Sequence, residues 1–199
     1  MEEIPEFVSA TRFRNWGSFL IKRDNPDSEN IKQDGVIWSD PNVFDVFDIP
    51  LVKGNDDKCL DDPNSVIISE SAARKYFNDE DPINKSLILN NSKNVKVTGI
   101  FEDMPANSHF QFDVMISMKG LDESKSEMWI SNNFHTYFLM ANNSEPALVL
   151  DKINEMFESP IIKSGTISGF LPVSNSNRNN TSFFKKGQST ADNSINLQQ

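Results

Sequence analysis

The chain has 199 residues, and its 15 Phe and 3 Trp can build the core of one compact domain or of two small lobes. Its 19 basic and 29 acidic residues give a formal net charge of −10, which repels phosphate backbones and argues against a nucleic-acid-binding protein. The sequence has no run of about 18 apolar residues that could cross a bilayer. Its single Cys59 excludes an internal disulfide and a multi-thiolate metal site.

The first fifty residues predict short strands followed by a short helix. The distribution of β-forming residues and turn residues predicts strands at 7–13, at 18–22 after Gly17, and at 35–39. Asp40 and Pro41 have the pattern of an N-cap and a first helical residue, which predicts a helix from 41 to about 47. The residues expected on its buried face are Val43, Phe44 and Phe47.

The next segment predicts a strand, a capped helix and a hairpin. A loop over 53–64 leads to a strand at 65–68, and Ser69 is expected to cap a helix over 70–77. The buried face of that helix is expected to hold Ala72, Ala73, Tyr76 and Phe77. Residues 86–89 and 95–101 predict the two arms of a hairpin around 90–94.

The last structured part predicts two strands and one longer helix. Strands are expected at 110–118 and 134–140, and a helix is expected over 146–158. The apolar stripe expected on that helix consists of Ala147, Leu148, Leu150, Ile153 and Phe157. Residues 159–199 are mostly polar and bury too little apolar surface to offset their ordering entropy, so we expect a flexible tail after a folded domain over 1–158.

No motif in the chain points to an enzyme or to a bound cofactor. The sequence lacks a phosphate-binding loop, a dinucleotide-binding glycine pattern, a His-Glu-x-x-His zinc motif and a Gly-x-Ser-x-Gly elbow. Ser108 and His109 are adjacent, and neighbouring side chains on a strand point to opposite faces, so they are a poor candidate for a catalytic Ser–His pair. Carboxylates around Cys59 raise the pKa of its thiol and make it a poor nucleophile.

Two further groups of residues have a functional and a structural interpretation. The acidic residues at 56–57 and 61–62 lack the spacing of a calcium loop, so a solvated loop is the simpler interpretation. Trp16, Trp38 and Trp129 would form a sugar-binding platform if they were exposed, whereas core packing is the commoner role. A secreted or surface module that binds sugar or peptide is therefore the alternative function.

Three segments in series carry a more specific signal. They are DPNVFDVFDIPLVKG at 40–54, VIISESAARKYFNDEDPINK at 66–85 and VTGIFEDMPANSHFQFD at 97–113. Their order and spacing resemble the MacB-like periplasmic core domain of FtsX/MacB/LolC-type ABC transporter permeases, in the form common in Bacteroidetes. The resemblance covers roughly residues 5–158. The family has Gly where this chain has Asn78 and Asn84, and Asn tolerates the positive φ that such positions require.

The resemblance implies which residues form the structural signature of the domain. It assigns no residue to catalysis, to a cofactor or to a metal. The signature residues are Phe44, Phe47, Gly54, Ser69, Glu70, Ala72, Phe77, Pro82, Gly99, Pro105, Ser108, His109, Phe112 and Asp113.

The resemblance also implies a fold, a location and partners. It implies an α+β fold with mixed sheets, a few short helices and two lobes, called Porter and Sabre in the family. The domain would be non-catalytic and would lie on the periplasmic face of the bacterial inner membrane. It would transmit ATP-driven motion of the transmembrane helices to the export or extraction of a substrate. The implied partners are the transmembrane helices of the same permease, a cytoplasmic ABC ATPase and a second permease copy, and no cofactor is implied.

Three expectations follow for the core, the ends and the tail. The residues expected to be buried are Phe44, Phe47, Ala72, Phe77, Ile100, Phe112 and Phe157. Pro5 and Glu158 are expected within about 25 Å of each other, because an excursion between two membrane helices returns to one surface. Residues 168–184 resemble the start of the second extracytoplasmic region of longer members, which predicts a junction without the transmembrane helices that separate the two regions there.

Overall fold

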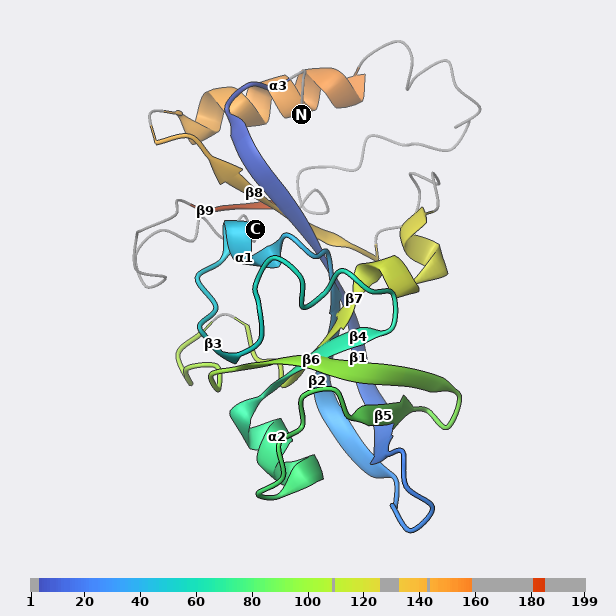
Figure 1. Ribbon diagram of the computed structural model, residues 1–199. Helices are drawn as coiled ribbons and strands as arrows, with labels where there is room; N and C mark the ends of the chain where they lie inside the picture. Colours follow the sequence, from blue (N-terminus) through green and yellow to red (C-terminus); the bar gives the residue numbers. More distant parts are fainter. Residues whose placement is uncertain (1–3, 109, 126–132, 143, 159–180, 185–199) are drawn as a thin grey trace. The chain divides into compact units, whose positions relative to one another are not determined.

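The computed structural model describes residues 4–108, 110–125, 133–142, 144–158 and 181–184 (Figure 1). They form the expected α+β fold, with a mixed sheet and a few short helices. The strands are β1 (Phe7–Arg23), β2 (Ile31–Ser39), β3 (Leu51–Lys53), β4 (Ser65–Ser69), β5 (Ser86–Leu89), β6 (Lys93–Phe101), β7 (Val114–Ser117), β8 (His135–Met140) and β9 (Thr181–Phe184). The helices are α1 (Val43–Val46), α2 (Glu70–Phe77), α3 (Pro146–Glu158) and the 3-10 turns η1 (Met118–Gly120) and η2 (Asp122–Lys125).

The chain divides into two compact units, in agreement with the two lobes expected. The larger unit is Thr11–His135, and the smaller unit combines Met1–Ala10 with Thr136–Gln199. Among the described residues, no helix is both long and apolar enough to cross a membrane.

The larger unit is built on a closed ring of six strands. β1 pairs antiparallel with β2 and β5, β5 with β6, and β4 with β7, whereas β2–β7 and β4–β6 are parallel pairs. Each of these strands therefore has a neighbour on both sides, and closure removes the unpaired edges of an open sheet. β3 is added to the end of β6.

The side chains that point to the inside of this ring form its core. Every second residue of a strand faces the same side, and these residues form one buried cluster together with the apolar face of α2. Its members include Val36, Trp38, Val66, Ile68, Ala72, Tyr76, Phe77, Val95, Val97, Val114 and Ile116. The expected burial is confirmed for Phe47, Ala72, Phe77, Ile100 and Phe112, whereas the side chain of Phe157 lies outside the described residues.

The first strand is longer than the sequence predicts. Residues 7–23 form one strand rather than two, and Gly17 lies inside it with φ of 84°. The pairing of β1 with β2 shifts register on both sides of Gly17. Glycine adopts this backbone conformation without steric cost, so a bulge forms where a break is predicted.

The first helix is shorter than predicted, and its burial differs at one signature residue. α1 covers Val43–Val46, and its N-cap is Asn42 without a side-chain cap bond, so the prediction that Asp40 caps it is wrong. Val43 and Val46 are buried, whereas Phe44 is half-buried. Because successive helical residues rotate by about 100°, Phe44 leaves the face that Val43, Val46 and Phe47 share.

The second helix agrees with the prediction in detail. Ser69 Oγ accepts a hydrogen bond from the backbone N–H of Ala72 at 3.1 Å, which confirms the predicted cap. Asn78 ends the helix with φ of 52°, and Asn84 has φ of 65°. Both Asn residues thus supply the positive φ expected where the family has Gly.

Two regions between the helices and strands differ from the expectations. β3 starts before the predicted loop at 53–64, and its pairing with β6 is not visible in the sequence pattern. β7 covers only Val114–Ser117, so the predicted strand at 110–118 is too long. Residues 110–113 lie outside the strand: the N–H of Phe110 donates to Ser108 Oγ at 3.2 Å, and the N–H of Asp113 makes one bond to Gly35 O at 3.0 Å just before the parallel pairing of β2 with β7 begins.

The smaller unit has a small core of its own. Ile4, Met140 and Val149 are buried, and Phe7, Phe138 and Ile153 pack against them. α3 has the predicted bounds, but the predicted stripe is wrong at Ala147 and Leu148, which are both exposed. Val149 and Ile153 are one helical turn apart and form the buried face instead.

Part of the predicted tail is structured. Residues 181–184 form β9, which pairs parallel with residues 136–139 of β8. They include Phe183 and Phe184, the one apolar pair within residues 174–199, and β8 offers them backbone partners. The rest of the segment 159–199 lies outside the described residues.

Candidate functional site

The second and third signature segments meet where β4 ends. The N–H of Ser69 donates to Asp113 O at 2.8 Å, and Ser69 Oγ donates to Asp113 Oδ1 at 3.0 Å. The same hydroxyl caps α2 by accepting from Ala72. Ser69 therefore starts the helix and holds the third segment at once, which explains why both Ser69 and Asp113 belong to the signature.

A second contact joins the same two segments on the surface. Asp103 accepts hydrogen bonds from the N–H and the hydroxyl of Ser71, at 2.8 Å and 2.6 Å, and lies 3.2 Å from Arg74 Nη2. Partial burial disfavours its charged form, but the hydrogen bonds from Ser71 prevail and lower the pKa of Asp103. The carboxylate therefore stays ionised and acts as a tether for the first turn of α2.

Aromatic rings join the first segment to the third. The rings of Phe47 and Phe110 lie edge to face with centroids 5.3 Å apart, and Phe110 and Phe112 are 6.3 Å apart. Phe13 of β1 stacks on Phe47 at 5.4 Å. Edge-to-face and stacked pairs at these distances add to the free energy of burial, so the signature rings act as packing groups.

Two signature glycines lie against each other. Gly54 has φ of 114°, and a Cβ added to it would lie 2.9 Å from both Gly99 Cα and Thr98 O. A Cβ added to Gly99 would lie 2.9 Å from Ile67 Cγ2. The chain after β3 can therefore approach β6 only where both residues lack a side chain.

The remaining signature residues form turns and helix starts. Glu70 lies in the first turn of α2, where a carboxylate is favoured by the helix dipole. Pro82 is buried, and its carbonyl accepts from Lys85 N at 3.0 Å. Pro105 O accepts from Ser108 N at 2.8 Å. His109 lies outside the described residues.

The cysteine has no features of a nucleophile. Burial, followed by the nearby Asp56 and Asp61 carboxylates, raises the pKa of the Cys59 thiol to about 12. Its Sγ is 3.8 Å from Asp56 O. In the acidic loop, Asp61 pairs with Lys119 at 2.8 Å. No group of three His, Cys, Asp or Glu residues that could hold a metal occurs in the part of the chain that the structure describes.

The tryptophans give little support to a sugar-binding platform. Trp38 is 5 % exposed and lies in the core of the larger unit, so it cannot present its ring to a ligand. The side chain of Trp16 and the whole of Trp129 lie outside the described residues.

A polar hollow lies beside the Ser69–Asp113 junction. It measures about 480 Å³ and is lined by residues of β2, of α2 and of the segment 103–113. The buried Gln33, which the sequence analysis missed, joins its walls: its Oε1 accepts from Lys75 Nζ at 2.8 Å and from Tyr76 OH at 2.9 Å. Its Nε2 donates to Asp113 Oδ2 at 3.0 Å. These groups satisfy one another, so the hollow holds a structural network.

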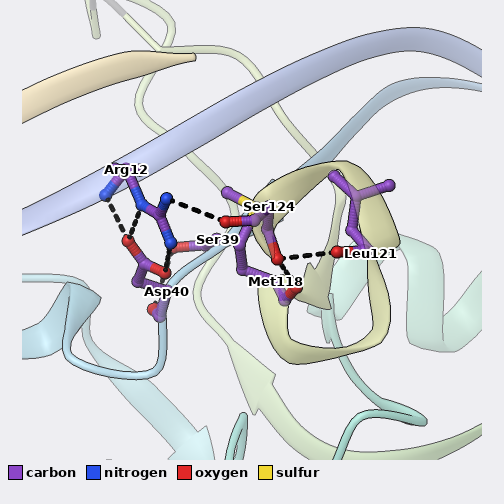
Figure 2. Close-up of polar contacts among 6 residues, drawn as sticks. All are labelled: Arg12, Ser39, Asp40, Met118, Leu121 and Ser124. Carbon is purple, nitrogen blue, oxygen red and sulfur yellow. Dashed lines mark hydrogen bonds and ion pairs between the residues drawn. The ribbon is translucent and has the colours of Figure 1, made fainter. Parts of the chain in front are cut away.

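An arginine near the start of the larger unit makes a second set of side-chain contacts that the sequence analysis missed (Figure 2). Arg12 Nε lies 2.8 Å from Asp40 Oδ2, and Arg12 Nη2 lies 3.0 Å from Asp40 Oδ1. Arg12 Nη1 donates to Ser124 O at 3.4 Å. Asp40 thus binds Arg12 rather than capping α1, and it raises the pKa of the guanidinium.

Comparisons with known proteins agree with the resemblance. The family profile described as MacB-like periplasmic core domain matches residues 1–156. A solved domain of a putative permease from Porphyromonas gingivalis is similar at 27 % identity and a TM-score of 0.68, covering 79 % of this chain and 72 % of that one.

Two further solved structures show the same fold at lower identity. The periplasmic region of MacB from Actinobacillus actinomycetemcomitans has 16 % identity and a TM-score of 0.57, covering 78 % of this chain and 68 % of that one. The extracellular domain of the ABC-type transporter YknZ from Gram-positive bacteria has 14 % identity and a TM-score of 0.50, covering 75 % and 72 %. A comparison with curated protein sequences gives no match.

Proposed function

Because the chain belongs to the family of MacB-like periplasmic core domains, it is a non-catalytic extracytoplasmic domain of an ABC transporter permease, and we propose that it transmits motion of the transmembrane helices to a substrate. The substrate would be exported or extracted on the far side of the membrane. No chemistry in the domain is required for this role, because the ATPase partner supplies the energy.

The proposal rests on the observation that the signature residues make contacts between segments of the domain. Ser69, Asp113, Gly54, Gly99 and the aromatic rings connect three distant segments into one body. A body that passes on a displacement must resist deformation, and a closed, densely packed strand ring does so. Residues that bind a ligand or react with it would instead be left with unused polar groups.

The two ends of the domain support the same proposal. The Lys152 ammonium of α3 forms an ion pair with Glu6, and the N–H of Ala141 donates to Glu6 O at 3.0 Å. α3 continues for six residues beyond Lys152, which is about 9 Å along a helix axis. The segment that starts the domain is thus tied to the helix that ends it, as expected if both ends return to one membrane.

We further propose the partners and the domain bounds. Residues 1–158 would be the core domain, and 159–199 would belong to a tail or to a second extracytoplasmic region. The transmembrane helices of the same full-length permease, a cytoplasmic ABC ATPase and a second permease copy would be the partners, and no cofactor would be needed.

Energy transfer from a fluorophore on the domain to acceptor lipids tests the proposed motion. The full-length permease and its ATPase would be placed in lipid nanodiscs, with the donor on a Glu29→Cys variant, since Glu29 is exposed. We expect the transfer efficiency to change when ATP is added and to stay constant with an ATPase that cannot hydrolyse ATP. A transfer efficiency that does not change on addition of ATP, while the ATPase hydrolyses ATP, would contradict the proposal.

Two measurements on the 199-residue chain separate it from the alternative function. Spin labels at residues 5 and 158 should give a distance within about 25 Å, and a distance beyond about 40 Å would exclude an excursion between two membrane helices. A carbohydrate array and calorimetry with ATP should both give no binding; sugar binding would favour the surface module.

A further inference from the structure

The larger unit joins the rest of the chain at two places, and one residue touches both. The chain enters this unit at Thr11 and leaves it at His135. Arg12 follows the entry, and its guanidinium carbon lies 5.5 Å from the ring centroid of Phe134, which precedes the exit. A guanidinium over an aromatic ring at this distance is attracted to it.

Arg12 and Asp40 hold each other through backbone and side chain together. Besides the two side-chain contacts, the N–H of Arg12 donates to Asp40 Oδ2 at 3.0 Å, and the N–H of Asp40 donates to Arg12 O at 3.2 Å. Figure 2 shows the planar guanidinium facing the carboxylate edge to edge. A bidentate pair of this kind fixes orientation as well as distance, because two parallel bonds resist rotation.

The third contact of Arg12 extends into the core of the larger unit. Arg12 Nη1 donates to Ser124 O, and Ser124 Oγ donates to Met118 O at 3.0 Å and to Leu121 O at 2.6 Å (Figure 2). Met118 and Leu121 belong to the buried cluster inside the strand ring. Arg12 therefore links the entry strand to the η1–η2 segment and, through it, to the core.

We propose that Arg12 is a positioning residue that fastens the entry and the exit of the larger unit to each other, so that the two connections move as one. The inference rests on the proposed function, since a domain that transmits motion loses displacement wherever a connection bends. A connection without such contacts could rotate about its backbone bonds. The contacts of Arg12 with Asp40, Ser124 and Phe134 would restrict that rotation at both connections.

The same strand supplies a matched control. Arg23, at the far end of β1, makes a bidentate pair with Glu80, at 3.2 Å and 2.9 Å, and its guanidinium lies 5.2 Å from the ring centroid of Phe77. This pair is of the same chemical kind and belongs to the same unit, but it lies far in sequence from both connections. Removing the Arg23–Glu80 pair shows how much the loss of any bidentate pair changes the measured distances, independent of its place in the unit.

Distances between spin labels test the proposal on the whole 199-residue chain. One label pair would join Leu148→Cys in the smaller unit to Glu29→Cys in the larger, and a second pair, Glu29→Cys and Asp57→Cys, would lie within the larger unit; all three positions are exposed. Cys59 is buried and stays unlabelled. Arg12→Gln and Arg23→Gln would be compared with the unchanged chain, after circular dichroism has shown that each variant folds.

We expect Arg12→Gln to broaden the first distribution about twofold and to leave the second unchanged, because the bidentate geometry is lost. Arg12→Lys, which keeps the charge but not the fork, should broaden it to an intermediate extent and serves if Arg12→Gln does not fold. Arg23→Gln should broaden neither. An unchanged first distribution in a folded Arg12 variant, or equal broadening in Arg23→Gln, would overturn the proposal. This outcome leaves the ATP-dependent energy transfer, and so the proposed function, unaffected.

Discussion

The two units of this domain differ most in how their strands are closed. In the larger unit, six strands form a ring around one continuous core, and the signature residues connect its loops. In the smaller unit, β8, α3 and the first residues of the chain share a core of three buried residues among those described. The comparison teaches that, among the described residues, the larger unit has the more extensive core, while the smaller unit contains both ends of the chain and a small core.

The largest effect should come from emptying the core of the ring. Phe77 is fully buried between α2 and the strands, so we expect Phe77→Ala to lower the free energy of unfolding by about 3–5 kcal/mol. Urea titration followed by tryptophan fluorescence measures this value. A loss below about 1 kcal/mol would mean that the ring core does not dominate stability.

The next effect should come from the glycine contact that holds β3 against β6. Gly54→Ala combines strain at φ of 114° with a Cβ 2.9 Å from backbone atoms, and we expect a cost of about 2–4 kcal/mol. Gly17→Ala is the control, because Gly17 also has positive φ but has no atom within 4 Å of an added Cβ. Its cost should be about 1–2 kcal/mol in the same titration. Equal losses of unfolding free energy in the two variants would show that the close approach of Gly54 to β6 does not affect stability.

A milder change should loosen the smaller unit alone. Val149→Ala removes two methyl groups from its core, and we expect a loss of about 1–2 kcal/mol. Hydrogen exchange followed by mass spectrometry should show faster exchange at Ala141 N–H and unchanged exchange at Ser69 N–H. Faster exchange at both amides would mean that the two units open together, and the comparison between them would fail.

The smallest effect should be a dependence on acid. Hydrogen bonds from Lys85 and Arg23 lower the pKa of Glu80 in the larger unit to about 2. A carboxylate whose pKa is lowered by folding stabilises the fold above its unfolded pKa of about 4.3, and this contribution is lost as the pH falls toward 2. Urea midpoints between pH 5 and pH 2, compared for the unchanged chain and Glu80→Gln, should therefore converge on acidification. A constant difference would show that the ion pairs of Glu80 do not stabilise the fold.

Local chemistry predicted the parts of the fold that depend on neighbours in sequence. The cap at Ser69 and the positive φ at Asn78 and Asn84 follow from each residue and its immediate context, and the structure confirms them. The burial of Phe44 and Leu148 was predicted wrongly, because an error of one residue in the helical phase turns a side chain by about 100°, away from the buried face. The bulge at Gly17 was interpreted as a break between two strands, because a glycine within a strand pattern can mark either a bulge or a turn.

Contacts between distant segments could not be predicted from the pattern. The pairing of Phe13 with Ser39, which closes the ring, and the pair Arg12–Asp40 join residues that are 26 and 28 positions apart. Asp40 had a good local explanation as a helix cap, and nothing nearby indicated Arg12 as its partner. The resemblance identified Gly54 and Gly99 as signature residues, but only the structure shows that an added Cβ at Gly54 would meet the backbone of β6 and one at Gly99 would meet Ile67.

Closure of the strand ring also bears on how readily this domain could add a strand from a neighbouring molecule. A sheet with an exposed edge invites a neighbouring molecule to add a strand through backbone hydrogen bonds, which is a common route to aggregation. In the described larger unit each of the six ring strands is paired on both sides over at least part of its length, and β3, at three residues, is short, so little edge remains as a template. Closure thus limits the addition of strands from another molecule and leaves side chains as the main surface of the larger unit.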